Sequence, residues 1–511
     1  MINLKINNIQ VKAKEGSSVL EAASSAGFDV PAMCNYNGLE QFTSCMVCVV
    51  KDRNGGALMP SCAVKAQEGM DIVTEDEEIF EARKTALELL LSEHSGDCEA
   101  PCRIACPAFM NIPLMNRHIA QEDLQSAFEV VIKDIALPRV LGRICPAPCE
   151  GACKRKAVDQ PVAVCLLKRF AADNFKFIAQ PSKPDKNKAV AIIGAGPAGL
   201  AAAFFLQSAG IKAEVFDNHE KPGGSLRYDL DEKELDKAVL DQEIEVIKNC
   251  GVTFHQNSNI DSKRFEELIK NYEAVIVATG NYTDKIGSWG LENNGKTLLV
   301  NKSTYLTNIE KVFAVGNVNR SGKLAIRSLA QGKEVAKIVI ELLQEGVIKG
   351  KSRKFNSVLG KLISEEFPEY LNEASSDNRY EPGNDGFSLE VARKEAARCI
   401  HCDCRKPENC KLRNYAEEYD VSKKRFAYTK RKPVKKHIKT DLVVYEPGKC
   451  IKCGICVRIT AKQKEKFGFT FIGRGFDVEI GAPFNRSLEA ALEKTAREVA
   501  EACPTGALCG F

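Results

Sequence analysis

The chain has 511 residues, of which 27% are charged, and its formal net charge at pH 7 is only +4. This length predicts several domains, and so small a net charge argues against a dedicated nucleic-acid binder. No apolar run approaches the roughly 20 residues that a membrane-spanning helix needs.

Nearly all of the 21 cysteines stand in groups along the chain, and only Cys250 and Cys509 fall outside them. We expect no secretory leader before the strand predicted at 2–6. Cysteines that stand in groups in such a chain are more typical of metal or cluster ligands than of disulfides. Thiolates at gaps of two and three residues present several sulfurs to one inorganic core. We therefore expect a cytoplasmic protein that binds iron-sulfur clusters.

The first expected domain comprises residues 1–80. Alternating apolar residues at 2–6 and 9–11 predict a β-hairpin, and Ser18-x2-Glu21 predicts a helical capping box. Four cysteines follow, at Cys34, Cys45, Cys48 and Cys62. Their tight pair and distant fourth cysteine agree with plant-type ferredoxins, although the first gap is longer. The region resembles the [2Fe-2S] domain that opens the large iron-sulfur subunit of respiratory complex I and of multimeric iron-only hydrogenases, which implies a β-grasp fold.

Residues 81–185 contain two strings of cysteines. The first string is Cys98, Cys102 and Cys106, and the second is Cys145, Cys149 and Cys153. The second string, followed by Pro161-Val-Ala-Val, resembles the helical domain of the glutamate synthase small subunit and of dihydropyrimidine dehydrogenase. That resemblance implies two [4Fe-4S] clusters, around which the two strings interlace.

The first departure from this family concerns a missing cysteine. The family's first motif begins with one more cysteine, whose position falls at or beside His94. Complex I starts one cluster motif with His-x3-Cys, so His94 is a candidate nitrogen ligand for the cluster of Cys98, Cys102 and Cys153. The alternative is a solvent-facing histidine at a helix end.

The second departure is Lys168, which stands where the family has a Gln or Glu ligand. A protonated lysine is a poor ligand, and Cys165 lies one helical turn away on the same face. The expected ligands of the second cluster are therefore Cys106, Cys145, Cys149 and Cys165. The alternative is that Cys165 is a small buried hydrophobic residue.

Residues 186–345 show the order of a dinucleotide site: an apolar strand at 189–193, a glycine turn, a helix at 200–209, a strand at 212–216 and then Asp217. Glycines let the backbone approach a pyrophosphate at the helix N-terminus, and the acidic residue can bind ribose hydroxyls. The candidate residues in the turn are Gly194, Gly196, Pro197, Ala198 and Gly199.

Three later motifs resemble the FAD landmarks of the glutamate synthase family and favour FAD over NAD. Their candidate residues are Gly224, Arg227, Thr279, Gly280, Gly316 and Asn317. In that family an NADPH-binding unit lies between the last two landmarks. Here only 34 residues separate Gly280 from Val315, without a second GxGxxG. A single βαβ unit takes about 30 or more residues and a nucleotide-binding domain needs several, so we expect the NADPH domain to be missing. Because Asn317 replaces an acidic residue, an empty scaffold stays the alternative to an FAD site.

Residues 346–440 are expected to form a linker with a knot of four cysteines, Cys399, Cys402, Cys404 and Cys410. Four sulfurs so close are expected to share one metal site. A [4Fe-4S] cluster is favoured over a tetrahedral Zn site because the surrounding chain is rich in cluster motifs. The basic stretch from Lys423 to Lys439 is either a solvated linker or a docking site for an acidic partner such as a ferredoxin.

Residues 441–511 contain a ferredoxin motif, with ligands expected at Cys450, Cys453, Cys456 and Cys503. The second motif of two-cluster ferredoxins is missing, so one [4Fe-4S] cluster is expected. The region between the cysteines resembles the iron-sulfur subunits of hydrogenases and formate dehydrogenases.

The expected fold is a multidomain α/β protein with a β-grasp [2Fe-2S] domain, a helical domain with two [4Fe-4S] clusters, a Rossmann-like FAD domain and a C-terminal ferredoxin-like domain. The resemblances imply an electron-transfer subunit of a bifurcating hydrogenase, transhydrogenase or formate dehydrogenase complex. Its partners would be an NADH-oxidising flavin subunit, a small [2Fe-2S] subunit, and a hydrogenase, other catalytic or ferredoxin-linked subunit. No residue is expected to act in acid–base catalysis. The alternatives are a free-standing NAD(P)H-dependent reductase and a structural scaffold.

Overall fold

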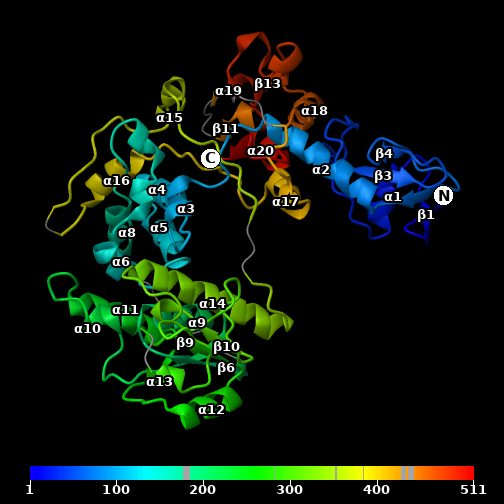
Figure 1. Ribbon diagram of the computed structural model, residues 1–511. Coiled ribbons are helices and arrows are strands. Elements are labelled where there is room, and N and C mark those ends of the chain that lie inside the picture. The colour runs from blue at the N-terminus through cyan, green and yellow to red at the C-terminus, as the bar shows by residue number, and fades with distance from the viewer. Residues whose placement is uncertain are drawn as a thin grey trace. The chain divides into compact units, whose positions relative to one another are not determined.

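The computed structural model describes residues 1–175, 185–281, 284–350, 354–383, 385–426, 433–435 and 442–510. The chain forms two compact units, which are traced in Figure 1. The first unit comprises Met1–Ala100, Lys354–Asn372 and Cys402–Phe511, and the second comprises Pro101–Arg353 and Glu373–His401. The first unit thus contains the expected domains 1–80 and 441–511, and the second contains 186–345. The expected domains 81–185 and 346–440 are each divided between the two units.

The first unit begins with a five-stranded sheet in the order β2-β1-β5-β3-β4. The predicted hairpin is present, with Ile6 opposite Ile9, and Ser18 and Glu21 form the predicted capping box. Leu4, Ile6, Val11 and Ala13 are buried and the residues between them in each strand are exposed, because successive side chains of a strand point to opposite faces. The elements are β1 (Ile2–Ile6), β2 (Ile9–Ala13), α1 (Val19–Ser25), β3 (Val49–Asp52), β4 (Leu58–Pro60) and β5 (Asp71–Val73).

The rest of the first unit packs around the long helix α2. Arg83 on this helix is buried and donates hydrogen bonds to the carbonyl of Val49 and to the hydroxyl of Tyr419. One apolar core joins α2 to the C-terminal elements through Leu87, Leu412 and others. The elements are α2 (Glu77–Ser92), α15 (Phe367–Leu371), α17 (Lys411–Glu418), β11 (Val443–Tyr445), α18 (Ile455–Lys462), β12 (Thr470–Ile472), β13 (Glu479–Gly481), α19 (Leu488–Ala491), α20 (Ala496–Ala502) and β14 (Leu508–Gly510). Strand β11 pairs with β14, and β12 with β13, both antiparallel.

The second unit opens with short helices. They are α3 (Pro101–Ala105), α4 (Ile112–Ala120), α5 (Leu124–Ile132), α6 (Pro138–Ile144), α7 (Pro148–Gly151), α8 (Val164–Asp173) and, from later in the chain, α16 (Leu389–Ala397). Helix α6 packs closely on α8 at Gly142, which has no side chain. A Cβ at this position would lie only 2.7 Å from the Cβ of Arg169. Helix α16 returns to pack against α4 and α8.

A parallel sheet in the order β10-β9-β6-β7-β8 forms the rest of the second unit. Its strands are β6 (Asp185–Ile193), β7 (Ile211–Phe216), β8 (Thr253–His255), β9 (Ala274–Val277) and β10 (Val312–Ala314). Its helices are α9 (Pro197–Ser208), α10 (Ser225–Tyr228), α11 (Lys237–Asn249), α12 (Ser262–Asn271), α13 (Asp284–Gly287) and α14 (Ala325–Glu345). Between β9 and β10 the described residues form α13 and irregular chain. Strand, glycine turn, helix and strand follow in the predicted order, which brings the carboxyl ends of β6, β7 and β9 to one edge.

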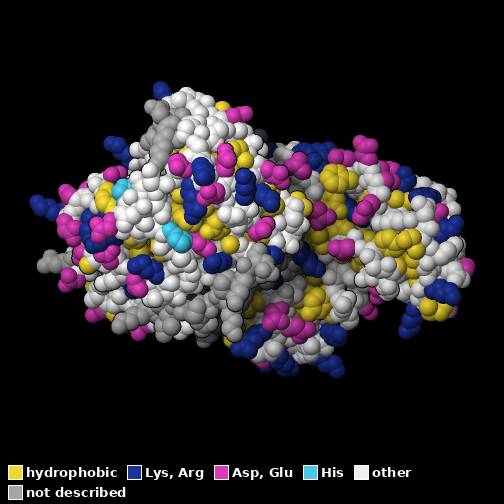
Figure 2. Space-filling model, turned by 90° about the horizontal axis from the view of Figure 1, so that it is seen from below, with side chains coloured by type: hydrophobic (Ala, Val, Ile, Leu, Met, Phe, Trp, Pro, Cys, Tyr) yellow, Lys and Arg dark blue, Asp and Glu magenta, His cyan; other side chains and the backbone are white. Residues whose placement is uncertain are grey.

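None of the helices in the described ranges is both long and apolar enough to cross a bilayer. On the face presented in Figure 2, Lys and Arg side chains are interspersed with Asp and Glu, as the net charge of +4 leads one to expect. In the basic stretch, Arg425 pairs with Glu88 at 2.8 Å. Lys430, Arg431, Lys432, Lys436 and Lys439 lie outside the described residues, so the choice between linker and docking site stays a prediction.

Candidate cofactor sites

The four cysteines of the N-terminal domain converge on one point. Cys34, Cys45, Cys48 and Cys62 are each at most 3% exposed. Hydrogen bonding from the thiols of Cys45 and Cys62 lowers the pKa of Cys34, and that from Cys62 lowers the pKa of Cys48 to about 7. Four buried thiols, linked by hydrogen bonds between Cys45 and Cys34, Cys34 and Cys62, and Cys62 and Cys48, are the donor set that a [2Fe-2S] cluster requires.

A second group of thiols surrounds a small cavity near the C-terminus. Cys450, Cys453, Cys456 and Cys503 all line it, together with Tyr445 and Thr505. Burial, reinforced by the neighbouring Cys503, raises the pKa of Cys450 to about 12. The backbone N–H of Lys452 donates to the Cys450 sulfur at 3.3 Å, as amides do toward cluster sulfurs. The predicted ligands are thus gathered around one space.

Arg458 joins these two groups within the first unit. Its guanidinium donates to the carbonyl of Cys34 at 2.9 Å and to the carbonyl of Cys453 at 3.3 Å. The thiol of Cys34 is also close enough to influence the pKa of Cys453. The N-terminal and C-terminal thiol groups are therefore neighbours. No local sequence pattern predicts this contact, because it joins residues 424 positions apart.

In the second unit, the four cysteines predicted for one cluster surround a single cavity. Cys106, Cys145, Cys149 and Cys165 line it, with Lys168 beside them. Hydrogen bonding from Cys165 lowers the pKa of Cys145 to about 6. Cys165 therefore lies where the prediction needs a fourth sulfur, and its assignment as a ligand stays a proposal.

Lys168 is buried beside these four sulfurs and donates a hydrogen bond from Nζ to the carbonyl of Leu141 at 3.0 Å. Burial opposes its charge, but the thiols of Cys165, Cys145, Cys149 and Cys106 raise the pKa of Lys168 above its ordinary value. An ammonium group facing four thiolates partly neutralises them. The charge of the site therefore suits an anionic cluster.

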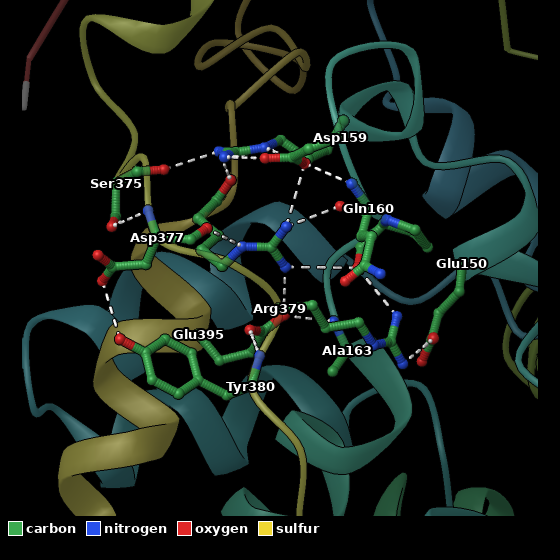
Figure 3. Close-up of polar contacts among 12 residues, drawn as sticks. Glu150, Asp159, Gln160, Ala163, Ser375, Asp377, Arg379, Tyr380 and Glu395 are labelled. Atoms are coloured by element: carbon green, nitrogen blue, oxygen red, sulfur yellow. Dashed lines mark hydrogen bonds and ion pairs between the residues drawn. The ribbon is translucent and has the colours of Figure 1, made fainter.

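Glu150 supports this site from the turn between Cys149 and Cys153. One carboxylate oxygen accepts the backbone N–H of Cys165 at 2.9 Å, and the other pairs with Arg379 at 2.8 Å. Figure 3 shows Glu150 and Arg379 facing each other across the two segments. The carboxylate thus holds the first turn of α8 against the cysteine turn.

A buried network in the same unit fixes the segment that leads to Cys399 (Figure 3). Arg155 lies two residues after Cys153 and donates to the carbonyl of Arg398 at 2.8 Å. Arg398 is fully buried and contacts Glu395 at 2.9 Å and Asp159 at 3.1 Å. The backbone before Cys399 is therefore held beside the turn that carries Cys153.

The structure does not place the knot of four cysteines in one unit. Cys399 belongs to the second unit, whereas Cys402, Cys404 and Cys410 belong to the first. The expected set of His94, Cys98, Cys102 and Cys153 is divided in the same way, with His94 and Cys98 in the first unit. These groupings rested on sequence spacing, and the chain crosses between units at Ala100 and again at His401.

In the described part of the chain, no three or more His, Cys, Asp or Glu side chains are placed so that they could hold a single metal ion. The Zn alternative for Cys399, Cys402, Cys404 and Cys410 stays a prediction. The unassigned Cys509 lies on β14, and its thiol donates to the carbonyl of Gly506 at 3.5 Å.

A cavity of about 350 Å³ lies at the carboxyl ends of β6, β7 and β9. Nine of the twelve predicted cofactor-binding residues line it: Gly194, Gly196, Pro197, Ala198, Asp217, Gly224, Thr279, Gly280 and Asn317. The other three are not among the described residues that line it. Arg227 pairs with Asp241, Gly316 donates its N–H to Gln331, and Gly199 packs against the carbonyl of Gly194.

Glycines shape the floor of this cavity. Gly194 has a φ of +111°, and a Cβ there would lie 2.4 Å from the carbonyl oxygen of Ala278. A Cβ on Gly224, with φ +51°, would lie 2.6 Å from the Cα of Gly196. Asp217 accepts the N–H of Ala195 at 2.6 Å and of His219 at 2.8 Å, which holds the glycine turn against β7. The turn thus exposes backbone at the helix N-terminus, as a nucleotide phosphate needs.

Two buried polar atoms of cavity residues have no hydrogen-bond partner within the described ranges: Thr279 Oγ1 and Trp289 Nε1. Unsatisfied buried groups facing a cavity fit a polar ligand such as FAD. Sequence reasoning missed Trp289 and also His219, whose ring stacks on Tyr228 at 4.4 Å. Trp289 is the only tryptophan in the chain, which was the one available signal.

Four family models match successive parts of the chain. They describe a 2Fe-2S iron-sulfur cluster binding domain (residues 1–77), dihydropyrimidine dehydrogenase domain II with its 4Fe-4S cluster (75–179), a pyridine nucleotide-disulphide oxidoreductase (168–332) and the ferredoxin-like domain of NADH-quinone oxidoreductase subunit 3 (440–509). The predicted fold class and the predicted cofactor classes, [2Fe-2S], [4Fe-4S] and FAD, are confirmed by these matches.

Three curated relatives share parts of the chain. The NADPH-Fe(3+) oxidoreductase subunit beta of Geobacter sulfurreducens (strain DL-1 / KN400) is 32% identical over 253 residues, or 46% of this chain and 38% of that protein. The NADP(+)-dependent formate dehydrogenase subunit beta of Moorella thermoacetica is 35% identical over 35% of this chain and 29% of that protein. The Glutamate synthase [NADPH] small chain of Bacillus subtilis (strain 168) is 34% identical over 36% of this chain and 40% of that protein.

The chain thus spans less than half the length of each of these relatives. The family models together place two types of iron-sulfur domain beside a pyridine nucleotide-disulphide oxidoreductase domain in this chain. The protein is accordingly an oxidoreductase component in which [2Fe-2S] and [4Fe-4S] domains are fused to a pyridine nucleotide-disulphide oxidoreductase domain.

Proposed function

We propose that the chain is the electron-transfer subunit of a multi-subunit oxidoreductase of the bifurcating hydrogenase, transhydrogenase or formate dehydrogenase type. It connects an NADH-oxidising flavin subunit, with its small [2Fe-2S] subunit, to a hydrogenase, other catalytic or ferredoxin-linked subunit. The clusters and FAD, when bound, would supply the one-electron chemistry. The residues of this chain hold these groups at fixed positions.

The observation that carries this proposal is the contact of Arg458 with both Cys34 and Cys453. One guanidinium fixes the backbone of two thiol groups that suit different cluster types. A rigid link of this kind keeps two redox centres at a constant separation, as a relay requires. The names of the Geobacter and Moorella relatives, each a beta subunit, also support a place in a larger complex.

A free-standing NAD(P)H-dependent reductase is the second candidate. The cavity of about 350 Å³ and the NADPH-linked names of the relatives favour it. Against it, the described residues between β9 and β10 form only α13 and irregular chain, where the glutamate synthase resemblance implies a second nucleotide fold.

Anaerobic stopped-flow reduction of the purified full chain distinguishes these functions. As a relay subunit, the chain is reduced slowly by NADH or NADPH and rapidly by dithionite. Rapid reduction by NADPH alone would contradict the relay and favour the reductase. Clusters that stay oxidised with every low-potential donor would favour a structural scaffold instead.

A further inference from the structure

Three cysteines from distant parts of the sequence meet in the first unit. The backbone N–H of Cys404 donates to the carbonyl of Cys98 at 3.2 Å, although the residues are 306 positions apart. Ser357 donates its N–H to the Cys98 sulfur at 3.3 Å. Cys410 is the N-cap of α17. Lys411, the first residue of that helix, donates its N–H to the carbonyl of Pro504 at 2.9 Å.

The three thiols are close enough to influence one another. Cys404 and Cys98 both lie within electrostatic reach of Cys410, and Cys404 lies within reach of Cys98. All three side chains are less than 9% exposed. They form a compact, buried group of sulfurs.

Cations face this group from two other elements. Lys449 is buried, pairs with Glu446 and lies close to the thiols of both Cys98 and Cys404. Arg413 on α17 is buried, pairs with Glu99 at 2.8 Å and also lies close to the thiol of Cys98. Positive charge beside several buried sulfurs suits an anionic metal cluster and offsets the cost of burying it.

A histidine supplies the fourth donor. His94 Nδ1 is buried and has no hydrogen-bond partner within the described ranges. Lys449 lies close to this imidazole as well as to the thiols of Cys98 and Cys404. A buried imidazole nitrogen without a hydrogen-bond partner is available to bind a metal.

We propose that His94, Cys98, Cys404 and Cys410 hold one [4Fe-4S] cluster in the first unit. Along the sequence, two of these ligands come before Pro101 and two come after His401. This replaces the two groupings expected from spacing. The assignment concerns ligands only and holds whichever partners the chain has.

The proposed site lies next to the thiol group of Cys450, Cys453, Cys456 and Cys503. A Cβ on Gly506 would lie 2.2 Å from the Cys404 sulfur, so this cysteine packs directly on the turn that follows Cys503. Cys503 in turn influences the pKa of Cys410. The new site therefore adjoins the C-terminal group, which Arg458 joins to the N-terminal one.

The test uses full-length protein purified without oxygen, with iron and zinc analysis and EPR of the dithionite-reduced state. We expect Cys98→Ala, Cys404→Ala and Cys410→Ala each to lose the same EPR signal and about four iron atoms. The double variant Cys98→Ala/Cys404→Ala should lose no more iron than either single variant, because the two residues serve one cluster. Cys250→Ala, which removes an ungrouped cysteine, should retain every signal.

Two results would overturn the proposal: additive iron losses in the double variant, or a stoichiometric zinc in place of the iron. The retained [2Fe-2S] signal shows that a variant is folded. His94→Cys provides a test that keeps the cluster: it should preserve the iron content but shift the EPR g-values and lower the reduction potential. An unchanged spectrum and potential in His94→Cys would exclude the histidine as a ligand.

Discussion

Two groups of cysteines differ in how the chain distributes them. Cys106, Cys145, Cys149 and Cys165 lie around one cavity, as the helical pattern predicted. Cys399 and Cys404 are only five positions apart in the sequence, yet they belong to different units. The first group lies on short helices, or directly after them, within one compact unit. The second lies on a segment that crosses between units.

The largest expected effect comes from the network that anchors this crossing segment. Arg398→Ala would leave the fully buried Glu395 without its cation and would remove one of the two arginines that pair with Asp159. We expect the second unit to lose about 3–5 kcal/mol of unfolding free energy. Denaturant unfolding with flavin or intrinsic fluorescence would measure this loss.

The matched control is Arg393→Ala, five residues earlier on α16. Its partner Glu122 is 51% exposed, and an exposed ion pair contributes about 0.2–1 kcal/mol. Equal losses in both variants would mean that the Arg155 and Arg398 network does not hold the segment before Cys399.

Local sequence patterns predicted much of the fold. The Ser18 capping box, the hairpin around Asn7 and the glycine turn at Gly194 depend on neighbours within a few residues, so they could be recognised directly. The contacts of Cys404 with Cys98, and of Arg458 with Cys34, depend on tertiary packing and left no local pattern. Trp289 and Arg398 were missed for the same reason, because an isolated aromatic or basic residue does not reveal its partners.

The next effect concerns the region where spacing and structure agree. Cys165→Ala should remove one cluster, or convert it to a form with fewer irons, with a loss of up to about four iron atoms per chain. Iron analysis and EPR would measure this. If Cys165→Ala keeps its full iron content and spectrum, this cysteine is a buried hydrophobic residue and Lys168 or another group completes the site.

The smallest effect tests charge at the same site without removing a ligand. Lys168→Met deletes the buried ammonium group that faces the four sulfurs and keeps a side chain of similar length. Because a positive charge favours the more negative, reduced state, its loss should lower the reduction potential of this cluster. At an effective dielectric constant near 20, the shift is on the order of 100 mV. An EPR-monitored redox titration would measure it, with the exposed Lys133→Met as the control that leaves the potential unchanged. A potential that does not move in Lys168→Met would mean that the cluster is not held beside Lys168, and the cavity of Cys106 and Cys165 would then need another occupant.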